Sequence, residues 1–182
     1  TATMNQLHSL EHAKDTNKPT IKRAEERIAL LAKQIKSIEN QIDTLIKSNA
    51  DIKQSVARLI SIPGVGVITA AIVLAETDFF KLFRNKSQLV SYAGLDIIER
   101  QSGTSIAGVK RISKKGNAHL RKILYLPAMV HIGKKSMYVQ NYLNIVERTR
   151  IKKKGIIAVQ RKLLVLMYAL HKKQEDFNPS YL

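Results

Sequence analysis

The sequence of 182 residues contains no cysteine and no tryptophan, and acidic residues are few. The absence of cysteine excludes a disulfide framework, a thiol nucleophile and a cysteine-based zinc site. No apolar run approaches the roughly 18 residues that a membrane-spanning helix requires, and the first residues lack the charged and apolar regions of a signal peptide. We therefore expect neither a membrane protein nor a secreted one. Because the sequence starts at Thr1 without a methionine, we expect a piece of a longer chain.

Basic residues are abundant and unevenly distributed. The 31 lysines and arginines stand against 14 acidic residues, a net charge of +17, and residues 81–173 hold 21 of these cations against three acids. A surface of this kind attracts phosphate through counterion release, whatever the sequence of the nucleic acid. The hydrophobic content of 45% is sufficient for a folded core. A folded protein that binds a polyanion is the natural interpretation, although such charge can also serve solubility alone.

A heptad pattern of apolar residues begins at Ile21. The a and d positions are occupied by Ile21, Ala24, Ile28, Leu31, Ile35, Ile38, Ile42 and Leu45. So narrow a stripe between charged flanks is typical of a coiled coil and needs a partner helix. Either a second chain or residues 5–14, folded back through a turn at 17–20, could supply it, and we favour the second chain. Asn49 could be a buried register residue, but a helix break with a new N-cap is the better interpretation.

A glycine turn, Pro63-Gly64-Val65-Gly66, separates two apolar segments, of which the second runs to about Ala75. This pattern predicts a helix-hairpin-helix. Glycine permits positive φ and close backbone approach, so amides at Gly64 and Gly66 could point at a phosphate. The alternative is a helical corner that only packs. No Lys or Arg lies between Arg58 and Lys81, so the residues leave both functions open.

Capping signals predict helices in the second half of the chain. Asn85 with Gln88 predicts the start of a helix over 86–93, which Gly94 ends. Asn117 predicts the start of another helix. The further elements that the pattern predicts are a helix over 118–132 bent at Pro127, a helix over 137–147, a basic linker over 148–155 and a helix over 156–171.

The polar, glycine-punctuated stretch over 96–117 predicts an extended surface loop. It contains the hydroxyl residues Ser102, Thr104 and Ser105, with cations nearby in the sequence. A serine hydroxyl can attack a DNA phosphodiester when cations stabilise the developing charge. Ser-Gly-Thr-Ser is also ordinary turn chemistry. The residues alone therefore leave a nucleophile and a simple turn as alternatives.

Metal ligands are not clustered in the sequence. The five histidines show no ligand spacing, and the three acids of the basic block are too few to hold two magnesium ions. We predict no metal site in this chain, so any metal must come with another domain.

Five motifs follow one another along the chain: Ser61-Ile62-Pro63-Gly64-Val65-Gly66, Tyr92-Ala93-Gly94-Leu95, Glu99-Arg100-Gln101-Ser102-Gly103-Thr104-Ser105, Arg111-Ile112-Ser113-Lys114-Lys115-Gly116-Asn117 and Leu120-Arg121. Their combination, order and spacing resemble the C-terminal domain of the IS-one-ten, Piv-type insertion-sequence transposases. The resemblance covers residues 59–171, and the preceding coil corresponds to the linking region of that family.

The resemblance implies more than the residues do by themselves. It implies that Ser102 is the nucleophile of a serine recombinase, with Ser105 as the second choice. Complete family members have an N-terminal RuvC-like domain whose four acidic residues bind Mg²⁺. The resemblance also implies a structured guide RNA that pairs with donor and target DNA. Oligomers joined through the coil and a bacterial cytoplasmic, nucleoid-associated location are also implied. This chain lacks the acidic domain, so we expect no strand cleavage by it alone.

We therefore predict an all-α fold, with a coiled-coil region over 1–50 and a compact basic domain containing the helix-hairpin-helix over 51–182. The predicted function is DNA transposition or site-specific recombination, with DNA, a guide RNA and further copies of the chain as partners. The residues predicted to contact nucleic acid are Gly64, Gly66, Arg100, Lys110, Arg111, Lys114, Lys115, Arg121 and Lys122. The alternative is a non-catalytic architectural module that binds DNA or RNA and dimerises through its coil.

Overall fold

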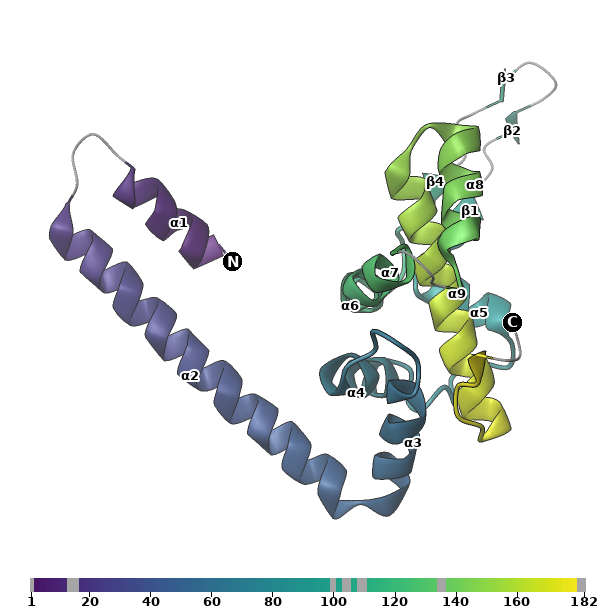
Figure 1. The fold of residues 1–182 in the computed structure, drawn as a ribbon, viewed down its shortest axis with the longest axis horizontal. Coiled ribbons are helices and arrows are strands. Elements are labelled where there is room, and N and C mark those ends of the chain that lie inside the picture. The colour runs from purple at the N-terminus through teal and green to yellow at the C-terminus, as the bar shows by residue number, and fades with distance from the viewer. Residues whose placement is uncertain are drawn as a thin grey trace. The chain divides into compact units, whose positions relative to one another are not determined.

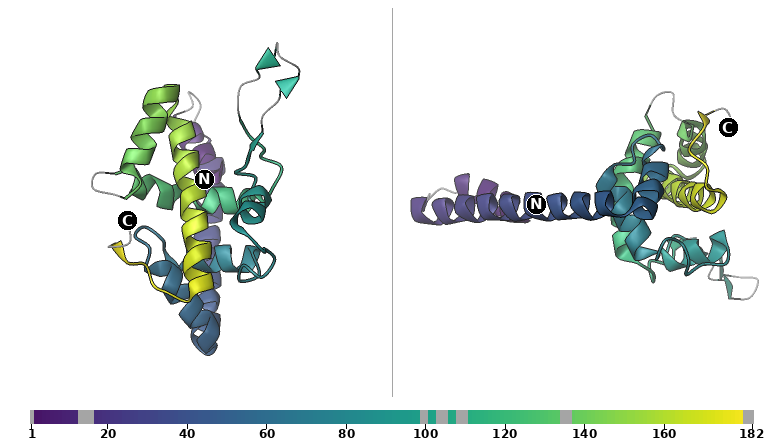
Figure 2. Two further views of the ribbon diagram at one scale, coloured as in Figure 1. Left: turned by 90° about the vertical axis from the view of Figure 1, so that its right-hand side faces the viewer. Right: turned by 90° about the horizontal axis from the view of Figure 1, so that it is seen from below.

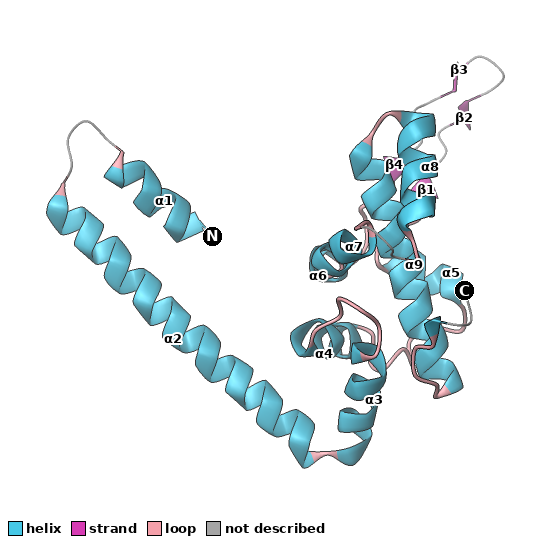
Figure 3. Cartoon of the chain, viewed as in Figure 1, coloured by secondary structure: helices cyan, strands magenta, loops and turns pink. Residues whose placement is uncertain are grey.

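The computed structural model describes residues 2–12, 17–98, 101–102, 106–107, 111–133 and 137–179, with the backbone alone at 98, 101–102 and 106–107. Helices dominate these residues, and two ladders of two-residue strands accompany them (Figure 3). The predicted all-α fold class is confirmed. Contacts within the chain define two compact units, Thr1–Asn49 and Ala50–Leu182.

The N-terminal unit is a helical hairpin (Figure 1). Its long helix α2 (Lys18–Ser48) begins after Asn17, whose side chain accepts a hydrogen bond from the Thr20 amide at 3.3 Å. Helix α1 (Ala2–Glu11) runs back along α2, and the half-buried residues Leu7 and Leu10 lie on one of its faces. The folded-back segment thus supplies a partner helix to α2 within the same chain, which was the less favoured of our two alternatives.

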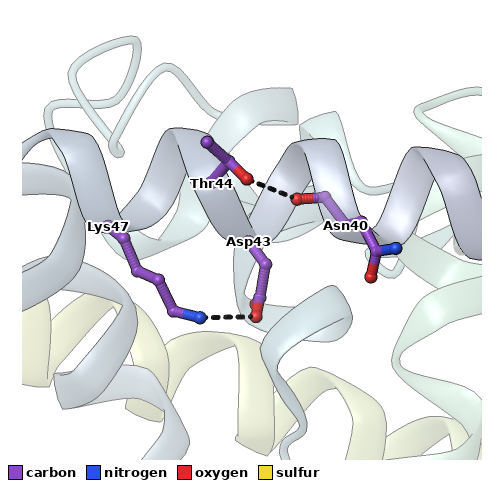
Figure 4. Close-up of polar contacts among 4 residues, drawn as sticks. All are labelled: Asn40, Asp43, Thr44 and Lys47. Atoms are coloured by element: carbon purple, nitrogen blue, oxygen red, sulfur yellow. Dashed lines mark hydrogen bonds and ion pairs between the residues drawn. The ribbon is translucent and has the colours of Figure 1, made fainter.

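The apolar seam of α2 is only partly covered. Residues at its start, such as Ile21 and Ile28, are half-buried. Large apolar side chains farther along are 40% exposed or more: Leu30, Leu31, Ile35, Ile38 and Leu45. The helix also carries polar contacts of its own, with Lys47 Nζ 3.2 Å from Asp43 Oδ2 and Thr44 Oγ1 donating to the Asn40 carbonyl at 2.9 Å (Figure 4).

The two units meet in the sequence at a helix break. Asn49 adopts an extended conformation (φ −127°, ψ 117°) between α2 and the next helix, α3 (Ala50–Ile60). The predicted break is therefore confirmed. Helix α3 packs against α4 (Val67–Glu76), and the turn at 61–66 joins the two helices. Together they form the predicted helix-hairpin-helix.

Helix α5 (Lys86–Tyr92) follows its predicted capping signals. The Asn85 side chain accepts a hydrogen bond from the Gln88 amide at 3.0 Å, and Gly94 has a φ of +65° just beyond the helix. The Gln88 side chain accepts from the Arg84 amide at 2.8 Å instead of returning to Asn85.

The segment over 96–117 is not the extended loop that we predicted. Strand β1 (Ile97–Ile98) pairs antiparallel with β4 (Arg111–Ile112), and between them in sequence β2 (Gln101–Ser102) pairs antiparallel with β3 (Ile106–Ala107). We call residues 97–112 the β-arm. The β-branched isoleucines at 97, 98, 106 and 112 favour such pairing, and their spacing among glycines concealed it in the sequence.

The helix predicted over 118–132 is divided in two. Helix α6 (Ala118–Ile123) ends before Leu124, and α7 (Tyr125–His131) follows. Pro127 lies in the first turn of α7 rather than at a bend. A proline ring clashes with the carbonyl four residues earlier, which belongs to Ile123, so α6 ends where the proline requires it to end.

The last two helices form a second hairpin. Helix α8 spans Val139–Thr149 and α9 spans Lys152–Lys173. The predicted basic linker over 148–155 is shorter than expected, because its second half belongs to α9. Gly155 lies within α9 against α8, where a Cβ atom would approach Tyr142 Cδ2 to 2.6 Å, and α8 can therefore pack closely on it.

Helix α9 runs through the C-terminal unit and contacts α3, α5, α7 and α8 (Figure 2). The core consists largely of fully buried leucines and neighbouring apolar side chains: Leu59, Leu74, Leu89, Leu120, Leu124, Leu163, Leu164 and Met167. Among the residues that the structure describes, no helix combines the length and the apolar character needed to cross a membrane.

Candidate nucleic-acid interface

The β-arm carries the predicted nucleophile. Ser102 lies in β2, and its backbone pairs with Ile106 of β3. The β2–β3 ladder lies farther from the helices than the β1–β4 ladder does (Figures 1 and 2). The side chain of Ser102 lies outside the described residues, as do Arg100, Ser105 and Lys110. The structure therefore places the backbone of Ser102 and leaves its contacts a prediction.

A pair of hydrogen bonds closes the base of the β-arm. The Ser113 amide donates to the Asp96 carbonyl at 3.0 Å, and the Ser113 hydroxyl donates to the Asp96 carboxylate at 2.5 Å. Next to this pair, the Lys114 amide donates to the Gly94 carbonyl at 3.2 Å, with Lys114 in the left-handed region (φ 54°). The two ends of the arm are thus held side by side.

Two glycines allow the chain to cross itself beside this base. A Cβ atom on Gly116 would lie 2.0 Å from the Tyr92 carbonyl oxygen and 2.6 Å from the Gly94 nitrogen. The Asn117 amide donates to that same Tyr92 carbonyl at 2.7 Å. Only glycine fits at 116, because the atoms that a side chain would meet are backbone and cannot rotate away.

Arg121 holds the crossing from one side. Its Nη1 donates to the carbonyls of Ala93 (3.0 Å) and Gly116 (2.9 Å), and the side chain is half-buried. The Gln160 amide group of α9 in turn donates to the Arg121 carbonyl at 2.8 Å. Arg121 was predicted as a phosphate contact, and in the structure part of its guanidinium binds the backbone of the crossing.

Asn117 connects the crossing to the helix-hairpin-helix. Its Oδ1 accepts from the amides of His119 and Leu120 at 2.8 and 3.2 Å, which confirms the predicted cap of α6. Its Nδ2 donates to Glu76 Oε2 at 2.6 Å, at the end of α4. The Tyr92 hydroxyl donates to the Glu76 carbonyl at 3.2 Å. Sequence analysis missed Glu76, since no local pattern relates residues 41 positions apart.

Four of the predicted phosphate contacts are exposed around this crossing: Arg111, Lys114, Lys115 and Lys122. None of their side chains makes an ion pair or hydrogen bond with another described residue. Arg111 belongs to β4, Lys114 and Lys115 follow it, and Lys122 belongs to α6. Unpaired cations on a fixed backbone are chemically suited to phosphate oxygens.

The turn of the helix-hairpin-helix differs at its two glycines. Gly64 has a φ of +78°, and a Cβ atom there would meet Val130 Cβ of α7 at 2.9 Å. Gly66 precedes α4 and has open space around it. His131 Nε2 lies 2.7 Å from the Pro63 carbonyl, so this nitrogen carries the proton and donates it. Burial lowers the pKa of His131, although this hydrogen bond opposes the shift.

The described residues contain no group of three or more His, Asp or Glu side chains that could hold a metal ion. The acids near the crossing, Glu76 and Asp96, are engaged with Asn117 and Ser113 respectively. The described part of the chain therefore does not fit a magnesium site.

Comparison with known proteins gives a family match. Residues 56–144 match the family described as Transposase IS116/IS110/IS902 family. The pilin gene-inverting protein of Moraxella bovis is 31% identical over 145 residues, which cover 79% of this chain and 45% of that protein. The transposase for insertion sequence element IS1111A of Coxiella burnetii is 29% identical over 142 residues, 76% of this chain and 38% of that protein. The chain thus spans less than half the length of either relative.

Proposed function

Residues 56–144 are a transposase domain of the IS116/IS110/IS902 family, and from this premise we propose that the chain acts in DNA transposition or site-specific inversion as the part that grips DNA and supplies a serine nucleophile. The observation that carries the proposal is the β-arm, which is anchored at its base by Asp96, Ser113 and the glycine crossing. It includes Ser102 in a paired strand, and the exposed cations Arg111, Lys114, Lys115 and Lys122 follow that strand in the sequence.

The proposed reaction is an attack of Ser102 Oγ on a phosphodiester. The Oγ–P bond forms and the bond from phosphorus to one sugar oxygen breaks, which leaves a phosphoserine link and a free DNA end. The serine proton passes through solvent to the departing sugar oxygen. Lys114, Lys115 and Arg111 are suited to stabilise the charge that develops on the phosphate oxygens. The phosphoserine link conserves the energy of the broken bond for rejoining.

Partners follow from the same proposal. The basic domain would bind DNA backbones, and a structured guide RNA would select the sequence. The exposed apolar stripe of α2, including Ile35, Ile38 and Leu45, supports association of several copies through the coil, because such side chains would otherwise remain in water. An acidic domain elsewhere in the protein would bring Mg²⁺, and without it we expect no cleavage by this chain. The proposed location is the bacterial nucleoid.

The experiment is a search for a covalent protein–DNA adduct. The chain joined to its acidic domain is incubated with guide RNA, Mg²⁺ and both DNA substrates, then analysed on denaturing gels and by mass spectrometry. We expect an adduct on Ser102 that disappears in Ser102→Ala while DNA binding persists. Ser105→Ala, three residues along the same arm, is the matched control and should keep the adduct.

Two results would separate the alternatives. An adduct that vanishes in Ser105→Ala and survives in Ser102→Ala would move the nucleophile to Ser105. Cleavage without any adduct, unchanged in both variants, would leave this domain a non-catalytic module that positions nucleic acid.

A further inference from the structure

The connection between α8 and α9 carries a dense group of cations. Residues 148–154 contain five lysines and arginines and no acid: Arg148, Arg150, Lys152, Lys153 and Lys154. We call this segment the basic tip. All of these side chains except the half-buried Lys154 are exposed. Within the described part of the chain, none of the five forms an ion pair or a side-chain hydrogen bond.

The basic tip has a defined backbone. The Arg150 amide donates to the Val146 carbonyl at 2.7 Å, and the Thr149 hydroxyl donates to the Ile145 carbonyl at 2.7 Å. Close packing of Gly155 on Tyr142 joins the two helices directly below. The cations therefore extend from a fixed support, which reduces the entropy cost of binding a ligand.

Folding accounts for only part of these charges, because Arg148 and Arg150 lie at the C-terminal end of α8, where cations complement the helix dipole. The cations of the first turn of α9 oppose its dipole, and that turn contains no acid to offset them. Arg150 has a φ of 55°, a left-handed conformation that glycine or asparagine adopts more readily. Charges that repel one another at a strained position are explained more simply by an anionic partner outside the chain.

The position of the basic tip within its unit fits such a partner. The tip and the β2–β3 ladder of the β-arm extend toward the same end of the C-terminal unit (Figures 1 and 2). A long polyanion held near Ser102 therefore has a second set of cations available at this end.

We propose that the basic tip is a second binding surface for the phosphodiester backbone of the nucleic acid that the β-arm engages. The inference rests on the proposed function. Cations on the end of a helical hairpin contact phosphates without reading bases, so binding here is independent of sequence. Both DNA and RNA present this backbone, and the test distinguishes them.

The test uses the whole chain and two variants of equal charge. The tip variant combines Arg148→Gln, Arg150→Gln, Lys152→Gln and Lys153→Gln. The control variant neutralises four exposed cations of α2 with Lys22→Gln, Arg23→Gln, Lys33→Gln and Lys36→Gln. Fluorescence anisotropy measures the affinity of each for a mixed-sequence DNA duplex and for a single-stranded RNA over a series of salt concentrations.

We expect the affinity of the tip variant to fall about tenfold or more at low salt. The slope of log affinity against log salt should decrease by about 0.9 for each phosphate of duplex DNA that the variant no longer neutralises. The control variant should keep both the wild-type slope and most of the affinity. A loss confined to RNA would make the guide RNA the source of the phosphates.

A smaller variant, Lys152→Gln with Lys153→Gln, leaves the strained Arg150 untouched and should reduce the slope by about half as much. Equal losses of affinity in the tip and control variants would overturn the proposal, since net charge would then explain both. Unchanged binding by the folded tip variant would also overturn it and leave the proposed function intact. If the wild-type chain bound neither DNA nor RNA, the proposed function itself would fail.

Discussion

The two units of the chain bury their apolar residues in different ways. Residues 1–49 contain eight lysines and arginines and six acids, whereas residues 50–182 contain 23 and eight. In the N-terminal unit the apolar side chains repeat along one helix, and Leu30, Ile35 and Ile38 stay more than half exposed. In the C-terminal unit the core is closed, and residues such as Leu59, Leu120 and Leu163 have no exposed surface.

This difference shows where each unit obtains its stability. The C-terminal unit combines a packed core with polar contacts between distant segments, such as Glu76 to Asn117 and Arg121 to Ala93. The N-terminal unit has one short helix packed on α2, and much of the apolar seam of α2 remains exposed to solvent. Substitutions in the C-terminal unit should change folding, and substitutions in the N-terminal unit should change association.

The largest effect on folding is expected at the glycine crossing. Gly116→Ala would place a methyl group against the Tyr92 carbonyl, so the free energy of unfolding should decrease by about 3 kcal/mol or more. Gly66→Ala is the control, because open space surrounds it, and it should cost about 1 kcal/mol or less, the loss expected when alanine replaces glycine at the N-cap of α4. Urea unfolding followed by circular dichroism measures both. Equal stability of the two variants would contradict the close approach at 116.

A smaller loss is expected when the bracing arginine is removed. Arg121→Met leaves the carbonyls of Ala93 and Gly116 without their donor, which should cost about 2 kcal/mol. Lys122→Met, at the exposed neighbouring position, should cost less than about 0.5 kcal/mol. The same unfolding measurement separates them, and equal costs would show that Arg121 does not brace the crossing.

The C-terminal unit should lose stability in mild acid. Burial lowers the pKa of both His131 and His171 below the ordinary value of 6.5. As the pH falls through 6.5, the unfolded chain binds protons that the folded chain does not, so the free energy of unfolding decreases until the folded pKa values are reached. Unfolding curves at a series of pH values test this. His131→Gln should flatten the dependence, whereas His119→Gln, at an exposed position, should leave it steep.

The smallest effect on folding, and the largest on assembly, is expected in the seam of α2. Ile35→Lys with Ile38→Lys should change the free energy of unfolding of the C-terminal unit by less than about 0.5 kcal/mol. Analytical ultracentrifugation should show that the proposed association through the coil is abolished. Lys33→Gln with Lys36→Gln, on the polar flank, should keep it. Identical sedimentation of wild type and the seam variant would show that the chain does not associate through the seam of α2.

Local signals in the sequence predicted the helices and their ends well. Asn85 and Asn117 act as caps as expected, and Asn49 separates two helices. These predictions succeeded because a cap depends on residues only three or four positions away. The division at Leu124 was missed, because we placed the effect of Pro127 at the proline and not at the carbonyl before it.

The candidate site was harder to predict. Asp96 and Ser113 close the base of the β-arm across 17 positions, and Arg121 reaches Ala93 across 28. Contacts of this kind depend on how the chain returns to itself, which periodicity does not encode. The resemblance to a family indicated Ser102 as the nucleophile without any knowledge of these contacts. The structure adds the hydrogen bonds that close the base of the β-arm in which Ser102 lies.

The closure of the β-arm has a consequence for how such proteins can diverge. The Asp96–Ser113 pair and the crossing at Gly116 hold the ends of the arm together independently of what lies between them. Once the ends are fixed, doubling the length of a flexible loop costs only about 0.6 kcal/mol in closure entropy. Insertions, deletions and new sequences between β1 and β4 should therefore be tolerated by the fold, so this segment could diverge while the helical body stays the same.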